Sequence, residues 1–238
     1  MGEGLDAQVQ ATVLRSLRHP RGRYLVDRAS QLSGIPRSTL YDWRREAIYV
    51  PDFSSSDPVA WSYRDLVFLR LLGWLRQLGM PRPLASEHVV EVKSLLAKGS
   101  EVRLLRADSR MLLINEERIN RFTGVNLLPF DDIFGLLSTF DLLEPIAELR
   151  RQGHRTWGPD LVNPSERTFI SPWVLAGDPC ITGTRIPTSA IHALRAERGL
   201  ASTDVVELYP GLTLEGAEDA YLLERRLRGH DLPEPAAA

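Results

Sequence analysis

Six side chains within nine residues carry the hydrogen-bond donors that helices use to contact nucleic acid. They are Arg37, Ser38, Thr39, Tyr41, Arg44 and Arg45. At helical spacing, Leu40 and Trp43 form an apolar side, and the donors occupy the outer side. Arginines of such a helix reach backbone phosphates, and its N-terminal polar side chains lie near base edges. The pattern predicts a DNA-recognition helix; the alternative is a protein-binding helical pair with a solvated basic face.

The residues before this stretch predict the turn that positions it. Leu32 faces inward on a preceding helix, and Gly34 suits a tight turn because glycine adopts a positive φ easily. Ile35 then fills the space between two helices, and Pro36 starts the second one, where no N–H is needed. Together these residues predict a helix-turn-helix.

A wing and two more helices are predicted next. Residues 47–62 are rich in proline, serine and aromatic side chains, which is typical of a wing or loop. Ser62 and Asp65 have the spacing of a capping box and open an apolar helix that Gly79 stops. A further apolar helix ends at Gly99.

In the middle of the chain, from residue 101 onward, the spacing of apolar residues no longer fits a helix. Residues 101–105 and 111–115 are apolar runs around a polar turn, so they predict a β-hairpin. This hairpin is a candidate dimer interface, because an exposed two-stranded edge is unstable alone. The alternative is an ordinary edge strand within one chain. Beyond it we expect helical segments at 133–140 and 142–151, an interdomain linker at 154–172 and an entering strand at 168–171.

The C-terminal part begins with a tight turn at residues 177–188 that holds two glycines, two prolines and Arg185. Helices are expected after it at 189–198, 203–208 and 213–227, the layout of a small helix-turn-helix-like domain. Arg185 contacts a partner protein or holds the turn by donating to backbone carbonyls. The basic cluster after the last helix enters an acidic pocket of a partner or simply complements the helix C-terminus. That cluster consists of Arg225, Arg226 and Arg228.

Charge is distributed unevenly along the 238 residues, whose net charge is −2. Residues 1–98 carry 14 Lys and Arg against 10 Asp and Glu, whereas residues 167–238 carry 7 against 10. We therefore expect phosphate contact at the N-terminal end only. The sequence has neither a long apolar run nor a signal region, which predicts a cytoplasmic protein without a membrane segment.

The sequence offers no pattern for catalysis, a metal or a cofactor. Its neighbouring acids at 116–117 and 131–132 point to different faces without His or Lys support. The five histidines have no ligand spacing, and the single Cys180 sits in an apolar turn where a thiol is inert. We expect a protein that is not an enzyme.

Two families share these motifs. Ser33-Gly34-Ile35-Pro36, Thr39-Leu40 and Trp43, followed by Tyr63-Arg64-Asp65-Leu66, resemble MerR-type winged helix-turn-helix regulators over residues 22–98. Gly183-Thr184-Arg185-Ile186-Pro187 and Tyr209-Pro210-Gly211 resemble a bacterial domain of unknown function often found in antitoxin-like proteins.

Both halves in one chain resemble the VapB-type antitoxins of type II toxin–antitoxin pairs. The resemblance implies a homodimer that binds a cognate PIN-domain ribonuclease toxin and represses its own operon by binding operator DNA. The toxin would then contact the C-terminal arginines, Arg185, Arg225, Arg226 and Arg228. The alternative is a stand-alone MerR-like transcriptional regulator whose C-terminal domain dimerises.

The expected fold is mainly α with a small β component. A winged helix-turn-helix domain would span 22–98, a hairpin and helical connector 99–166, and a helix-turn-helix-like domain 167–228, before a disordered tail at 229–238.

Overall fold

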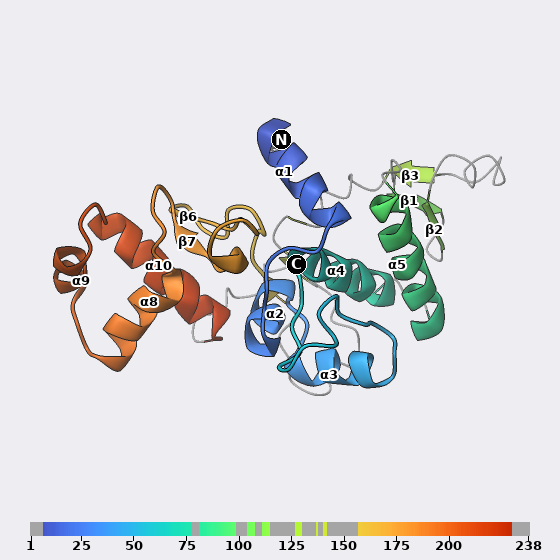
Figure 1. Ribbon diagram of the computed structural model, residues 1–238, viewed down its shortest axis with the longest axis horizontal. Helices are drawn as coiled ribbons and strands as arrows, with labels where there is room; N and C mark the ends of the chain where they lie inside the picture. Colours follow the sequence, from blue (N-terminus) through green and yellow to red (C-terminus); the bar gives the residue numbers. More distant parts are fainter. Residues whose placement is uncertain are drawn as a thin grey trace, which may run out of the picture.

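The computed structural model describes residues 7–77, 81–98, 104–107, 111–114, 127–129, 137, 140–141 and 157–229. The fold is mainly helical with small antiparallel sheets, as predicted. Helices α1 to α5 form one side of the molecule, and α8 to α10 form the other (Figure 1). The last turn of α10 reaches toward α2. The helix predicted at 142–151 and the tail from 230 onward lie outside the described residues.

The N-terminal half contains the predicted helix-turn-helix. Its helices are α1 (Ala7–Arg18), α2 (Val26–Ser33), α3 (Arg37–Arg45), α4 (Tyr63–Gln77) and α5 (Arg82–Ala97). Gly34 ends α2 with a φ of 76°, and its N–H donates to the carbonyl of Ser30 at 3.0 Å. Ile35 is fully buried between the two helices. Pro36 lies one residue before α3 rather than being its first residue, because its ψ of 145° is extended.

The predicted wing is a loop that packs back on the helix-turn-helix. Two isolated antiparallel bridges close it, one between Tyr24 and Trp61 and one between Phe53 and Ala60. Trp61 and Ala60 are buried, so the base of the loop belongs to the core.

The predicted hairpin is confirmed, and the structure adds a third strand. Strands β1 (Leu104–Ala107) and β2 (Met111–Ile114) pair antiparallel. Strand β3 (Leu127–Pro129) pairs with the other side of β1, so β1 is the central strand.

A second small sheet replaces the end of the helix predicted at 133–140. Phe140 lies in β4 (Phe140–Asp141), which pairs with β5 (Trp157–Gly158). Helix was the wrong prediction for Phe140, because its strand partner lies far along the chain and leaves no local signal. Apart from Phe140 and Leu137, that predicted helix lies outside the described residues.

The C-terminal helices are confirmed to within a residue or two. After the short pair β6 (Thr168–Phe169) and β7 (Cys180–Ile181) come α8 (Thr188–His192), its π-helical continuation η4 (Ala193–Glu197), α9 (Ser202–Leu208) and α10 (Leu214–Leu227). Thr213 caps α10, because its hydroxyl accepts from the Gly216 N–H at 3.1 Å.

The two halves share one hydrophobic core. The larger core cluster joins side chains of α1 to α5 to Leu161, Ile170, Leu223 and Leu227. Leu161 is fully buried, so the segment predicted as an interdomain linker contributes to this core, and the entering strand predicted at 168–171 is present as β6. A smaller cluster, including Ile191 and Val205, lies among α8, α9 and α10.

Candidate nucleic-acid interface

Helix α3 exposes five of the six predicted contact residues. Arg37, Ser38, Tyr41, Arg44 and Arg45 are exposed. Thr39 is only 8% exposed, so its side chain does not belong to this face. The reason is helical spacing, since Thr39 lies one turn before the buried Trp43. We call the five exposed residues the α3 face.

Acidic neighbours partly neutralise the α3 face. Arg37 pairs with Asp27 of α2 at 2.7 Å, and Arg45 pairs with Asp42 at 2.6 Å. Both pairs are exposed, and such pairs contribute only about 0–1 kcal/mol. A phosphate group can therefore replace either carboxylate. The guanidinium of Arg44 has neither a hydrogen bond nor an ion pair to any described residue, which leaves it available.

The wing carries carboxylates but no cation. Between Glu46 and Tyr63 the chain contains no Lys or Arg, whereas it contains Asp52 and Asp57. Asp57 is exposed near the end of the loop. A cation that binds a phosphate would therefore have to come from a part of the molecule other than the wing.

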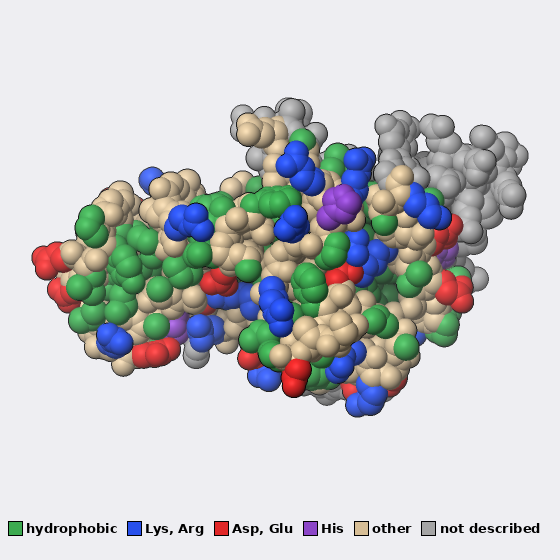
Figure 2. All heavy atoms as spheres, viewed as in Figure 1, with side chains coloured by type: hydrophobic (Ala, Val, Ile, Leu, Met, Phe, Trp, Pro, Cys, Tyr) green, Lys and Arg blue, Asp and Glu red, His purple; other side chains and the backbone are tan. Residues whose placement is uncertain are grey.

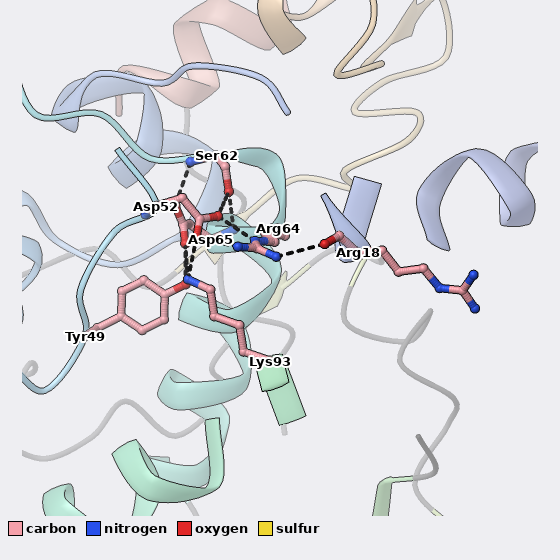
Figure 3. A network of polar contacts seen from close by, with 7 residues as sticks. All are labelled: Arg18, Tyr49, Asp52, Ser62, Arg64, Asp65 and Lys93. Carbon is pink, nitrogen blue, oxygen red and sulfur yellow. Dashed lines mark hydrogen bonds and ion pairs between the residues drawn. The ribbon is translucent and has the colours of Figure 1, made fainter. Parts of the chain in front are cut away.

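Asp65 caps α4 and anchors the start of the wing (Figure 3). Its carboxylate accepts from the N–H of Ser62 at 2.7 Å, and the Ser62 hydroxyl accepts from the Asp65 N–H at 3.1 Å. The predicted capping box is thus confirmed. The Tyr49 hydroxyl also donates to Asp65, at 2.6 Å. Burial is the main cause that raises the pKa of this carboxyl, against the lowering effect of Lys93.

Asp52 ties the wing to two helices. Arg64 of α4 donates to it through Nε at 2.6 Å and Nη2 at 2.8 Å, and Lys93 of α5 lies 2.8 Å away. Burial would raise the pKa of Asp52, but hydrogen bonds and charge from Arg64, Lys93 and Ser62 outweigh it and lower the pKa to about 2. The carboxylate is therefore ionised at neutral pH, and it fixes the wing against α4 and α5. A local pattern in the sequence predicted the cap, whereas no such pattern indicated this cluster.

Arg70 of α4 holds the end of α2 in place. Its side chain is fully buried, and it donates to the carbonyls of Leu32 at 2.5 Å, Leu137 at 3.2 Å and Pro159. Leu32 lies in the last turn of α2, where carbonyls lack helical partners. Burial lowers the pKa of the guanidinium to about 9, so it stays charged at neutral pH. This contact connects the helix-turn-helix to the segment after β5.

Arg28 of α2 joins the helix-turn-helix to the C-terminal part. Its guanidinium lies 2.9 Å from Asp178 and 2.9 Å from Glu224 of α10. Glu224 is fully buried and also accepts from the Thr188 hydroxyl at 2.6 Å. Burial raises the pKa of Asp178, whereas at Glu224 the effect of burial is outweighed by Arg28 and the pKa is lowered. Arg28 therefore stabilises the ionised form of the buried Glu224.

A turn with left-handed backbone conformation makes a second contact between the C-terminal part and the segment before α2. Leu175, Ala176 and Gly177 have φ values of 44°, 54° and 92°. The carbonyl of Ala176 accepts from the Arg23 N–H at 2.8 Å, and that of Gly177 accepts from the Tyr24 hydroxyl at 3.0 Å. The turn thus directs two consecutive carbonyls toward the segment that precedes α2.

The predicted toxin-binding arginines have different environments. Arg185 is exposed and has no hydrogen bond to a described residue, so it does not hold its turn as the alternative suggested. Arg225 lies over Tyr221 at 5.9 Å, and Arg226 lies over Trp157 at 5.7 Å. Arg228 lies 3.4 Å from Glu224. The cluster at the end of α10 is therefore next to the helix-turn-helix, a position that its sequence did not indicate.

The described residues bring no three His, Cys, Asp or Glu side chains together as metal ligands would lie. Cys180 is buried, and burial is the main cause that raises its pKa to about 11, so its thiol is protonated. Among the described helices, none has the length and apolarity to cross a membrane.

Comparison with known proteins gives one partial match. Residues 170–222 match the model of a family described as a protein of unknown function, DUF433. The match covers β7, α8, α9 and most of α10. No curated protein and no solved structure matches the chain. The chain thus combines a helix-turn-helix with a segment similar to DUF433.

Proposed function

We propose that this protein is a homodimeric repressor that binds operator DNA through the α3 face. The observation that carries the proposal is the α3 face itself. It presents hydrogen-bond donors to solvent, while the opposite side of α3 is buried in the core of the helix-turn-helix. Arg44 suits a phosphate, and Ser38 lies at the N-terminal end of α3, where base edges are contacted. One such module contacts only a few base pairs, which supports a two-fold dimer on a palindrome.

Titration of the purified chain with DNA from upstream of its own operon, at several salt concentrations, tests this proposal. Arg44→Gln should weaken binding to all sequences alike and lower the salt slope by about 1, because one phosphate contact is lost. Arg167→Gln is the matched control, since Arg167 is an exposed arginine on the C-terminal part. A wild-type protein that prefers no DNA sequence, or an Arg44 variant with an unchanged slope, would contradict the proposal.

A second function, neutralisation of a PIN-domain ribonuclease toxin, is supported by the C-terminal surface. The segment similar to DUF433 exposes Leu208, Leu214 and Leu222. Hydrophobic side chains gather over α8 to α10 (Figure 2). An apolar surface of this kind suits a protein partner. We therefore propose that the chain is a VapB-type antitoxin, with Arg185 as a candidate toxin contact.

Co-purification with the product of the adjacent gene tests the antitoxin proposal, followed by a ribonuclease assay of that partner. We expect a stable complex with suppressed RNA cleavage. Leu208→Glu should release the partner, whereas Val90→Glu, at an exposed apolar position on α5, should not. Operator binding without any complex would instead support a stand-alone regulator whose C-terminal part dimerises.

A further inference from the structure

A hollow of about 410 Å³ separates the start of α3 from the C-terminal part. Arg37 and Ser38 of α3 line one side, and Trp157 and Leu227 line the other. Leu227 is the last residue of α10. The end of α10 and the first turn of the α3 face therefore border the same space, which we call the junction hollow.

Arg226 and Arg228 precede and follow Leu227, the residue of α10 that lines the junction hollow. Arg226 is exposed, and its guanidinium lies 5.7 Å from the centre of the Trp157 ring that lines the hollow. Arg228 is 37% exposed and lies 3.4 Å from Glu224, a carboxylate already bound by Arg28. Neither guanidinium is enclosed, so each can reach a ligand that lies against this surface.

The position of these arginines relative to α3 is fixed by buried contacts. Glu224 is one helical turn before Arg228, and it is held on α2 by Arg28 at 2.9 Å. Leu223 and Leu227 belong to the same core cluster as Leu32 of α2. The end of α10 is thus a rigid extension of the helix-turn-helix.

Although residues 167–238 are acidic as a whole, their cations are concentrated at the end of α10, which suits an anionic partner at this place. Three of the seven Lys and Arg residues in 167–238 lie between 225 and 228. The wing has no cation with which to grip a phosphate. A duplex held by one helix requires backbone contacts outside the groove to set its orientation, and half or more of protein–DNA hydrogen bonds are of that kind.

We propose that Arg226 and Arg228 contact the backbone phosphates of the DNA that the α3 face binds, with the sugar–phosphate strand lying across the junction hollow. This inference rests on the proposed DNA-binding function. It gives the end of α10 a role in DNA binding in place of the toxin contact that the sequence suggested.

The test compares Arg226→Gln/Arg228→Gln with wild type in salt-dependent titrations of operator DNA and of a scrambled duplex. Loss of two phosphate contacts should lower the salt slope by about 2 on both duplexes. At fixed salt, affinity should fall by about tenfold or more. The matched lysine variant Arg226→Lys/Arg228→Lys should keep most of the slope, because it keeps both charges. Arg198→Gln, an exposed arginine after η4, should leave the slope unchanged.

The outcomes separate this inference from the function on which it rests. Wild-type binding with an unchanged slope in the glutamine variant would overturn the inference and leave the repressor proposal intact. A wild-type protein that does not bind DNA would contradict both the repressor proposal and this inference. If the glutamine variant keeps its DNA slope but loses the ribonuclease partner, the arginines belong to a toxin contact and the inference is wrong.

Discussion

Replacement of Arg28 by methionine should lower the free energy of unfolding by about 3 kcal/mol. Removal of one partner of a buried ion pair costs about 3–5 kcal/mol, because a charge is left without compensation. Here Glu224 is fully buried and keeps only the Thr188 hydroxyl at 2.6 Å and Arg228 at 3.4 Å. These remaining partners place the expected loss at the lower end of that range.

Arg37→Met is the control that isolates burial as the cause. Arg37 lies 2.7 Å from Asp27, a shorter distance than the 2.9 Å between Arg28 and Glu224. Its side chain is 59% exposed and that of Asp27 is 61% exposed. Solvent screens such a pair, so its loss should cost less than about 1 kcal/mol.

Urea unfolding followed by circular dichroism and tryptophan fluorescence measures both effects. The double variant Arg28→Met/Glu224→Gln should recover about 1–2 kcal/mol relative to Arg28→Met, because it removes the fully buried charge of Glu224. The other partner of Arg28, Asp178, is 29% exposed and keeps its charge in both variants. Equal losses in Arg28→Met and Arg37→Met would refute the reasoning. A double variant no more stable than Arg28→Met would refute it too.

Three further changes test other contacts. Gly177→Ala should destabilise the protein by about 2 kcal/mol more than Gly183→Ala in thermal or urea unfolding. Both glycines have a positive φ, so the backbone strain is similar. A Cβ at Gly177 would lie 1.9 Å from the hydroxyl of Tyr24, whereas a Cβ at Gly183 would meet nothing within 4 Å. Equal losses would contradict this account. Asp27→Asn should strengthen binding to operator DNA by about two- to fivefold in low salt, because it frees a guanidinium of the α3 face and removes an acid; weaker binding in fluorescence anisotropy would oppose it. The lowered pKa of Asp52 contributes stability above pH 4 that is lost as the pH falls toward about 2, so Asp52→Asn should flatten the acid limb of a stability–pH curve between those values. An unchanged acid limb would show that the carboxylate is not stabilised in this way.

Local signals predicted much of the fold. Gly34 and Ile35 gave the helix-turn-helix, and Ser62 with Asp65 gave the cap of α4, because each signal lies within a few neighbouring residues. The burial of Thr39 was also available from sequence, since a residue four positions before Trp43 shares its face.

Long-range contacts were not predictable in this way. Arg28 and Glu224 are 196 positions apart, and no pattern in either helix predicts that the two helices are in contact. Likewise, the three carbonyls around Arg70 belong to segments that are distant in sequence. The sequence shows only that Arg70 lies in an apolar helix, which does not identify the backbone groups that it binds.

The shared core has a consequence for the order in which the protein is made. Leu223 and Leu227 complete the cluster that contains Val13 and Leu17, yet about 130 residues separate the end of α5 from the end of α10. At a translation rate of about 5–20 residues per second, the ribosome takes on the order of ten seconds to add them. During that interval the nascent helix-turn-helix exposes the surface that α10 later covers. The surface of the helix-turn-helix that packs against α10 is therefore covered only after synthesis has reached this helix.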